Sequence, residues 1–199
     1  MLTNIVFILT GWILIVGVLR WSIVDLSHSV VHREMLRKSP FLARIISELF
    51  SVIFLTHTLE DYRRTHMKHH DPRVTFTPED DDFKLLLSLG FKPGMSVNQL
   101  KKHFYHCLIS PRFHWYMLVS RMCSNLGFGD SKTGNWRRIA AMLWISLIIY
   151  CAAFISLPVV IIGYLIPVIF VANCAALSQF ATEHEWVLWD LEWVKNRLM

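Results

Sequence analysis

Residues 139–180 read IAAMLWISLIIYCAAFISLPVVIIGYLIPVIFVANCAALSQF, a stretch without a single charged side chain. Long uncharged apolar runs are typical of membrane helices, each of which needs about 20 residues to cross a bilayer. The short Ser-Leu-Pro segment at 156–158 divides the run, and proline both interrupts a helix and favours a turn. The run therefore predicts a hairpin of two membrane spans, residues 139–157 and 159–180, with Pro158 at its turn.

A third span is predicted at the N-terminus, over residues 2–24, where Arg20 is the only charged residue. This segment lacks a basic leader and a small-residue cleavage site, so we expect a retained span rather than a removed signal peptide. The whole chain is 54% hydrophobic and only 18% charged, whereas about a quarter of a typical soluble domain is charged. We therefore expect a single all-α integral membrane domain over residues 1–199, with three full spans.

A fourth apolar stretch, residues 41–56, is short for a span and contains Arg44 and Glu48 one helical turn apart. Ser39 and Pro40 before it predict a helix start, with serine as N-cap and proline at the first helical position. A full crossing would put the histidines before and after it on opposite sides of the membrane. We favour an interfacial or re-entrant helix, which keeps them on one side.

The distribution of basic residues predicts the orientation in the membrane. With three full spans, all 20 Lys and Arg residues fall on one side or at its boundary, and this side should be cytoplasmic. The section from about 27 to 138 and the tail from about 181 are then inside, with every histidine. Membrane placement also explains the net charge of +5, so no nucleic-acid partner is expected.

Within the cytoplasmic section, local signals predict short helices rather than a separate domain. Thr77 is the predicted N-cap of one helix, which Gly90 ends, and the acids at 79–82 are interpreted as its first turn rather than as a cation site. Two further helices are predicted over residues 100–109, after a capping box at Ser96 and Gln99, and over residues 111–126.

Histidines cluster at three places beside the predicted spans. His28 and His32 lie four residues apart, so both imidazoles can share a helix face. His66 lies three and four residues before His69 and His70, so two or three of these rings share a face. Neutral imidazole is the commonest side-chain metal ligand, and six rings exceed the four that one tetrahedral ion needs. Spacing alone leaves Zn, Cu, Fe and Ni open. The predicted metal ligands are His28, His32, His66, His69, His70 and His184.

Each ligating imidazole needs a hydrogen-bond acceptor on its other ring nitrogen. The acidic residues near the clusters are Asp25, Glu34, Asp61, Asp71, Glu183 and Glu185. Of the remaining histidines, we expect His57 to be hydrogen-bonded near the membrane interface and His114 to be structural. His103 and His106 are interpreted as part of an interfacial amphipathic helix, with a role as replacement ligands as the alternative.

The two boxes, His28-x-x-x-His32 and His66-x-x-His69-His70, set among these apolar spans, resemble those of the membrane fatty acid desaturases and related hydroxylases. Glu183-His184 is similar to the isolated histidine that follows the last hairpin in that family. The resemblance implies a di-iron centre at the cytosolic membrane face and an oxidoreductase of lipid metabolism that uses O2 to introduce a double bond into a fatty acyl chain. A hydroxylase of the same type is the alternative.

The resemblance also implies a fatty acyl substrate in the bilayer and a separate electron-transfer protein, because the sequence has no dinucleotide fingerprint and no haem or iron–sulfur motif. One departure is that no histidine follows Trp186, whereas the family has a final HxxHH or QxxHH box. We expect a fragment of a longer desaturase. The rival interpretation is a truncated, noncatalytic membrane protein that binds metal or acts as a scaffold.

Overall fold

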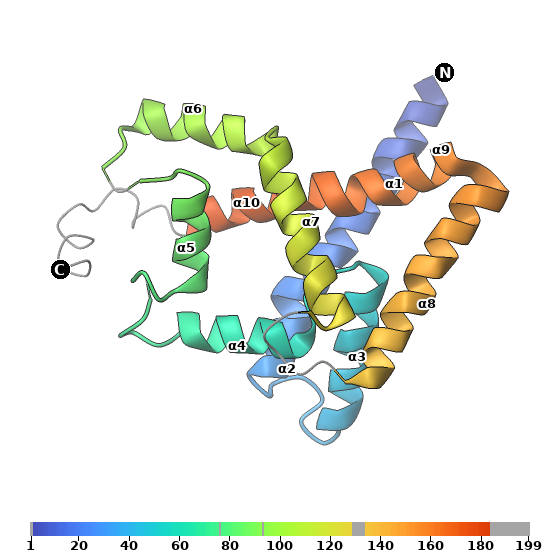
Figure 1. Cartoon of the computed structure of the whole chain (residues 1–199), viewed down its shortest axis with the longest axis horizontal. Helices are drawn as coiled ribbons and strands as arrows, with labels where there is room; N and C mark the ends of the chain where they lie inside the picture. Colours follow the sequence, from blue (N-terminus) through green and yellow to red (C-terminus); the bar gives the residue numbers. More distant parts are fainter. Residues whose placement is uncertain (1, 76, 93, 129–133, 184–199) are drawn as a thin grey trace. The chain divides into compact units, whose positions relative to one another are not determined.

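The computed structural model describes residues 2–75, 77–92, 94–128 and 134–183, which are helical and contain no strand. These described residues fall into two compact units, one made of those up to 62 and those between 116 and 175, the other of those between 63 and 115 and those from 176 to 183. Figure 1 shows the helices. In chain order the elements are α1 (Leu2–Trp21), η1 (Ser22–Ser27), α2 (His28–Val31), α3 (Pro40–Ile53), α4 (Leu59–His69), α5 (Asp81–Ser88), α6 (Val97–Leu108), α7 (Pro111–Leu126), α8 (Asn135–Cys151), η2 (Ala152–Ser156), α9 (Leu157–Val160), η3 (Ile161–Val171) and α10 (Ala172–Glu183), where η denotes π-helix.

Two helical stretches of the described chain, Asn4–Val31 and Asn135–Ala181, are long and apolar enough to cross a membrane. The second has 47 residues, which at about 1.5 Å each is more than twice the thickness of a hydrocarbon core. Its backbone is extended at Ser156 (φ −169°, ψ 113°), and Ser156 Oγ accepts a bond from Val159 N. Figure 1 shows the chain turning there from α8 into α9. The break predicted at residues 156–158 is confirmed, whereas the three-span count stays a prediction.

In the first unit, α1 packs against η3 around a small apolar core. Trp12 also donates from Nε1 to the carbonyl of Ile162 over 2.7 Å. In a π-helix this carbonyl would accept from residue 167, but Pro167 has no N–H to donate. The indole therefore offers this carbonyl a donor that residue 167 cannot supply. The core residues are Leu19, Phe54, Val168 and Ala172.

The fourth apolar stretch is the amphipathic helix α3, which begins at Pro40 as predicted. It ends at Ile53, before the end of the apolar stretch, because the chain reverses at Leu55 (φ 49°) and Thr56 N donates back to Ser51 O over 3.0 Å. This is a Schellman-type helix end. Ile53 O then accepts from the indole of Trp144 at 3.0 Å, so α8 covers the exposed carbonyl end of α3.

The second unit contains the short helices that follow the second histidine box. The capping box of α6 is confirmed: Ser96 N donates to Gln99 Oε1, and Gln99 N donates to Ser96 Oγ. The predicted start of α5 at Thr77 is wrong. The Thr77 hydroxyl instead closes a turn with Val74 O, and Asp80 is the N-cap, because its Oδ1 accepts from Asp82 N at 3.0 Å.

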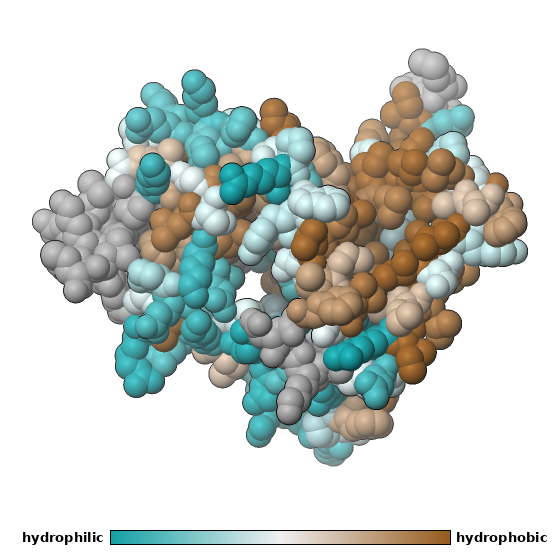
Figure 2. Space-filling view, viewed as in Figure 1, coloured by the Kyte–Doolittle hydropathy of each residue, from teal (hydrophilic) through white to brown (hydrophobic). Residues whose placement is uncertain are grey.

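Apolar side chains are exposed along α8 and η2. Leu143 is 67% exposed, Phe154 75% and Ile155 70%. Figure 2 shows hydrophobic surface over α8 and α9, whereas α6 presents mostly hydrophilic side chains in the same view. Contiguous apolar surface of this kind is rare on soluble proteins and marks contact with a membrane or another protein.

Candidate metal-binding site

The first histidine pair lies in the first unit, where the long N-terminal helical stretch ends. His28 begins α2, His32 is its C-cap, and their ring centroids are 4.4 Å apart. Their ligand nitrogens lie within 4.8 Å of each other, and both residues are half-buried. The predicted sharing of one helix face is therefore confirmed for this pair.

The position of this pair is fixed by hydroxyl contacts just before it. Ser27 Oγ donates to Ser22 O at 2.8 Å within η1 and lies 3.0 Å from Ser47 Oγ of α3. All three serines are buried. The segment immediately preceding His28 is thus joined to the buried face of α3, and the helix ends just after His32 at Arg33, whose φ is 59°.

The second pair, His66 and His70, lies in the second unit at the end of α4. Their Nε2 atoms are 3.0 Å apart, a hydrogen-bond distance in the absence of a metal, and their ring centroids are 4.4 Å apart. Metal–imidazole bonds are about 2.0–2.1 Å long, so two ligand nitrogens on one ion lie about 3 Å apart at a right angle and about 3.4 Å apart at the tetrahedral angle of zinc. The spacing and the donor type both fit adjacent ligands of one transition-metal ion.

The middle histidine of the second box has a different neighbour. His69 Nδ1 is 2.9 Å from Asp80 Oδ2 and 3.8 Å from Asp82 Oδ2. Its ring centroid is 6.3 Å from that of His70. Sequence reasoning missed Asp80 as an acceptor, because it interpreted Asp80 as a first-turn acid of a helix capped by Thr77.

The chain after α4 turns sharply through Asp71 to Thr75. The Arg73 side chain and backbone N–H donate to Asp71 and lower the pKa of that carboxyl to about 2. The Thr75 hydroxyl donates to the carbonyls of His69 and Asp71. Asp71, predicted as an acceptor for a histidine, thus pairs with Arg73, and the turn holds the end of the box.

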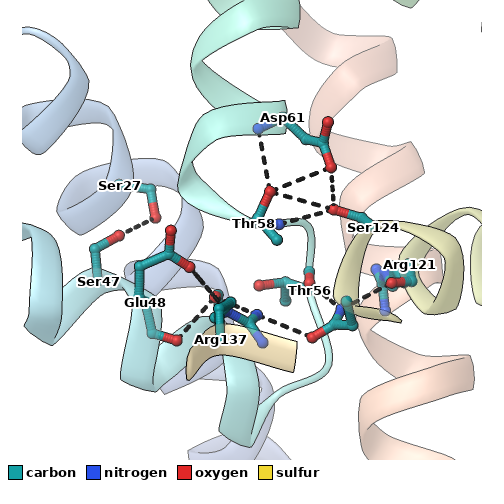
Figure 3. A network of polar contacts seen from close by, with 11 residues as sticks. Ser27, Ser47, Glu48, Thr56, Thr58, Asp61, Arg121, Ser124 and Arg137 are labelled. Atoms are coloured by element: carbon teal, nitrogen blue, oxygen red, sulfur yellow. Dashed lines mark hydrogen bonds and ion pairs between the residues drawn. The ribbon is translucent and has the colours of Figure 1, made fainter. Parts of the chain in front are cut away.

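Asp61, another predicted acceptor, belongs to a buried network in the first unit (Figure 3). Its carboxylate accepts from the hydroxyls of Thr58 and Ser124, and Thr58 N donates to Ser124 Oγ at 2.9 Å. These bonds join the first turn of α4 to the C-terminal half of α7. Asp61 therefore helps to fix where the helix carrying the second box begins.

Three histidines outside the boxes have structural partners. His57 Nε2 lies 2.9 Å from Ser120 Oγ, His103 Nε2 lies 2.7 Å from Leu89 O, and His114 Nε2 lies 2.8 Å from Leu108 O. His106 is exposed on α6. The predicted structural role of His114 agrees with its bond to a backbone carbonyl.

The remaining predicted ligand, His184, lies outside the described residues, as does Glu185. The structure therefore brings together His28 with His32 in one unit and His66 with His70 in the other. It places His69 against Asp80.

The chain was compared with protein families, curated proteins and solved structures. The sequence model of a family described as "Fatty acid desaturase" matches residues 4–198. No curated protein and no solved structure matches the chain.

Proposed function

The chain belongs to the fatty acid desaturase family, and from that premise we propose that it is an O2-dependent di-iron oxidoreductase that introduces a double bond into a fatty acyl chain. The observation that carries the proposal is the 3.0 Å approach of His66 Nε2 to His70 Nε2 inside the second box. Two imidazoles held at ligand spacing, in a chain of this family, favour a metal site over surface histidines.

The proposed ligands are both histidine boxes together with the isolated histidine. The assignment of both boxes to one centre rests on the family and on the box motifs. The chemistry of the donors supports it, since imidazole is a preferred ligand of iron. The six residues are His28, His32, His66, His69, His70 and His184.

When bound, iron supplies the activation of O2 needed to remove hydrogen from an unactivated C–H bond. Overall, the acyl chain loses two hydrogens and O2 is reduced to two waters, with two electrons and two protons from a donor. The chain's own contribution is to hold the imidazoles and to offer apolar helix surface to an extended acyl chain. Arg63 and Arg64, both exposed on α4, offer a basic surface to an acidic electron-transfer protein.

The proposed topology is multi-pass, with the histidine boxes on the cytoplasmic side and the turn at Ser156 outside. The positive-inside bias and the bend at Ser156 support it. Single cysteines at the exposed positions Leu157 and Ser88, in a chain without its native cysteines, test it. A membrane-impermeant thiol reagent applied from outside should label Leu157→Cys and spare Ser88→Cys. Labelling of both or neither in intact cells contradicts this topology.

The function is tested by metal content and lipid products of the purified and expressed protein. We expect about two irons per chain, and new unsaturated acyl chains by gas chromatography–mass spectrometry. His66→Ala should lose both, whereas His106→Ala, which removes an exposed histidine, should keep both. Hydroxylated products would assign the chain to the hydroxylases instead. A lack of iron, or a single zinc ion that is still bound by His66→Ala, would contradict the proposal.

A further inference from the structure

Asp80 and His69 form a close carboxylate–imidazole contact in the second unit. Asp80 Oδ2 lies 2.9 Å from His69 Nδ1, and Asp80 is only 1% exposed. The neighbouring Asp82 is 3.8 Å from the same nitrogen, and its side chain is 43% exposed. Of the two acids, Asp80 therefore has both the hydrogen-bond distance and the shielding from water that make a charge-assisted contact strong.

The two oxygens of Asp80 have different partners. Oδ1 accepts from Asp82 N at 3.0 Å and caps α5, which leaves Oδ2 to face His69. A helix N-terminus favours a negative charge, so the position favours the ionised carboxylate. The orientation of this carboxylate is thus set by the start of a helix and not by a freely rotating side chain.

The imidazole is held from its own side as well. The Thr75 hydroxyl donates to the carbonyls of His69 and Asp71, which fixes the last turn of α4. Lys68 on α4 also lies 3.7 Å from Asp81 on α5. These contacts keep the end of α4 and the start of α5 together, so the distance between His69 and Asp80 does not depend on their own bond alone.

An ionised carboxylate only accepts hydrogen bonds, so a neutral His69 beside it carries its proton on Nδ1. We infer that Asp80 is a positioning residue that holds His69 in the Nδ1–H tautomer and presents its Nε2 lone pair as a metal ligand. This inference rests on the proposed function, because it takes His69 as one of the iron ligands. It also gives Asp80 a role beyond its place as the N-cap of α5.

The cap at Asp80 makes a sharp test possible. Serine and asparagine are N-caps of about the same strength as aspartate. Asp80→Ser and Asp80→Asn should therefore keep α5, while serine is too short to reach His69 and asparagine carries no charge. Asp82→Asn is the matched control, since it removes an equal charge from the same cluster and leaves the contact between Asp80 and His69.

The first measurement is Fe²⁺ binding by the full-length protein in detergent, in competition with a chelator. We expect Asp80→Ser and Asp80→Asn to weaken binding by about 10- to 100-fold, the usual effect of losing such a partner. Asp82→Asn should stay within about twofold of the wild type. Unchanged binding in both Asp80 variants overturns the inference. Equal losses in the Asp80 and Asp82 variants also overturn it, because both acids would then act as ligands.

The second measurement needs no metal. In metal-free protein labelled with ¹⁵N at histidine, the ring shifts of His69, assigned by its absence in His69→Gln, report which nitrogen carries the proton. We expect Nδ1–H in the wild type and Asp82→Asn, and a shift toward Nε2–H in the Asp80 variants. An unchanged tautomer overturns the inference. Failure of the wild type to bind iron would instead reject the proposed function, while the tautomer still tests the contact.

Discussion

Arg137, at the start of α8, donates from Nε to Oε2 of Glu48 on α3 over 2.9 Å, and both side chains are almost completely buried. Arg137 Nη2 also donates to Ser51 Oγ and Asn125 Oδ1. Figure 3 shows this network, in which Arg137 connects α3, α7 and α8 within the first unit. Within the described part of the chain, Arg137 Nη1 has no hydrogen-bond partner. Burying this ion pair therefore costs desolvation free energy, and removing one partner costs more because the other charge stays buried without it.

Removing either partner should destabilise the protein strongly. Glu48→Ala or Arg137→Ala leaves an unpaired buried charge, and we expect each to cost about 3–5 kcal/mol. Glu48→Met combined with Arg137→Met should cost less than either alanine variant, because no charge stays buried. Thermal unfolding in detergent, monitored by intrinsic fluorescence, ranks the stabilities of these variants. A double variant less stable than both single variants would contradict a coupled pair.

The C-terminal end of α5 gives a second prediction. Gly90 has φ 92°, and Phe91 N and Gly90 N donate back to Leu86 O and Leu87 O, as in a Schellman motif. A Cβ at residue 90 would also meet the ring of His103 at 3.1 Å. We expect Gly90→Ala to cost about 1–2 kcal/mol. Gly17→Ala, in the middle of α1 with nothing within 4 Å of the added carbon, should instead stabilise the protein by about 0.5–1 kcal/mol in the same unfolding assay.

His57 gives a prediction about pH. Burial, with a smaller effect of the Arg121 charge, lowers the pKa of His57 from 6.5 to about 4, and Asp61 only partly offsets this. Below pH 6.5 His57 is protonated in the unfolded chain but stays neutral in the folded chain until the pH approaches 4. The free energy of unfolding therefore falls as the pH falls from 6.5 toward 4. Between pH 7.5 and 5 this amounts to about 2 kcal/mol.

The contribution of His57 is isolated by comparison with His57→Gln, which keeps a polar partner for Ser120 and does not titrate. Unfolding free energies of the two proteins at pH 7.5 and pH 5 should show a smaller acid-induced loss in the variant. Parallel losses would mean that other groups carry the pH dependence.

The features predicted from sequence depend on neighbouring residues. The break at Ser156, the capping box at Ser96 and the helix starting at Pro111 follow from residues within one turn of each other. The 3.0 Å approach of His66 to His70 likewise follows from helical spacing. Each of these depends on residues close in sequence and not on packing between distant elements.

The features that sequence missed depend on packing between elements. The ion pair between Glu48 and Arg137 could not be predicted from the sequence, because 89 residues separate the two and only the packing of α8 on α3 brings them together. Asp80 was interpreted only as a first-turn acid because its second partner, His69, lies on another helix. When a residue has one partner nearby in the sequence and another on a different helix, the sequence pattern indicates only the nearby one.

The assignment of both histidine boxes to one iron centre predicts how the loss of iron in a double variant compares with the losses in the two single variants. If His28 and His66 hold parts of the same pair of irons, removing either imidazole should release most of the metal, because each iron then loses a ligand or its neighbour. Iron per chain in His28→Ala, His66→Ala and the double variant should therefore be similarly low, far from additive. His106→Ala, which removes an exposed histidine on α6, should retain about two irons. Loss of one iron in each single variant and of both in the double variant would show that the boxes bind metal independently, and the shared centre would have to be abandoned.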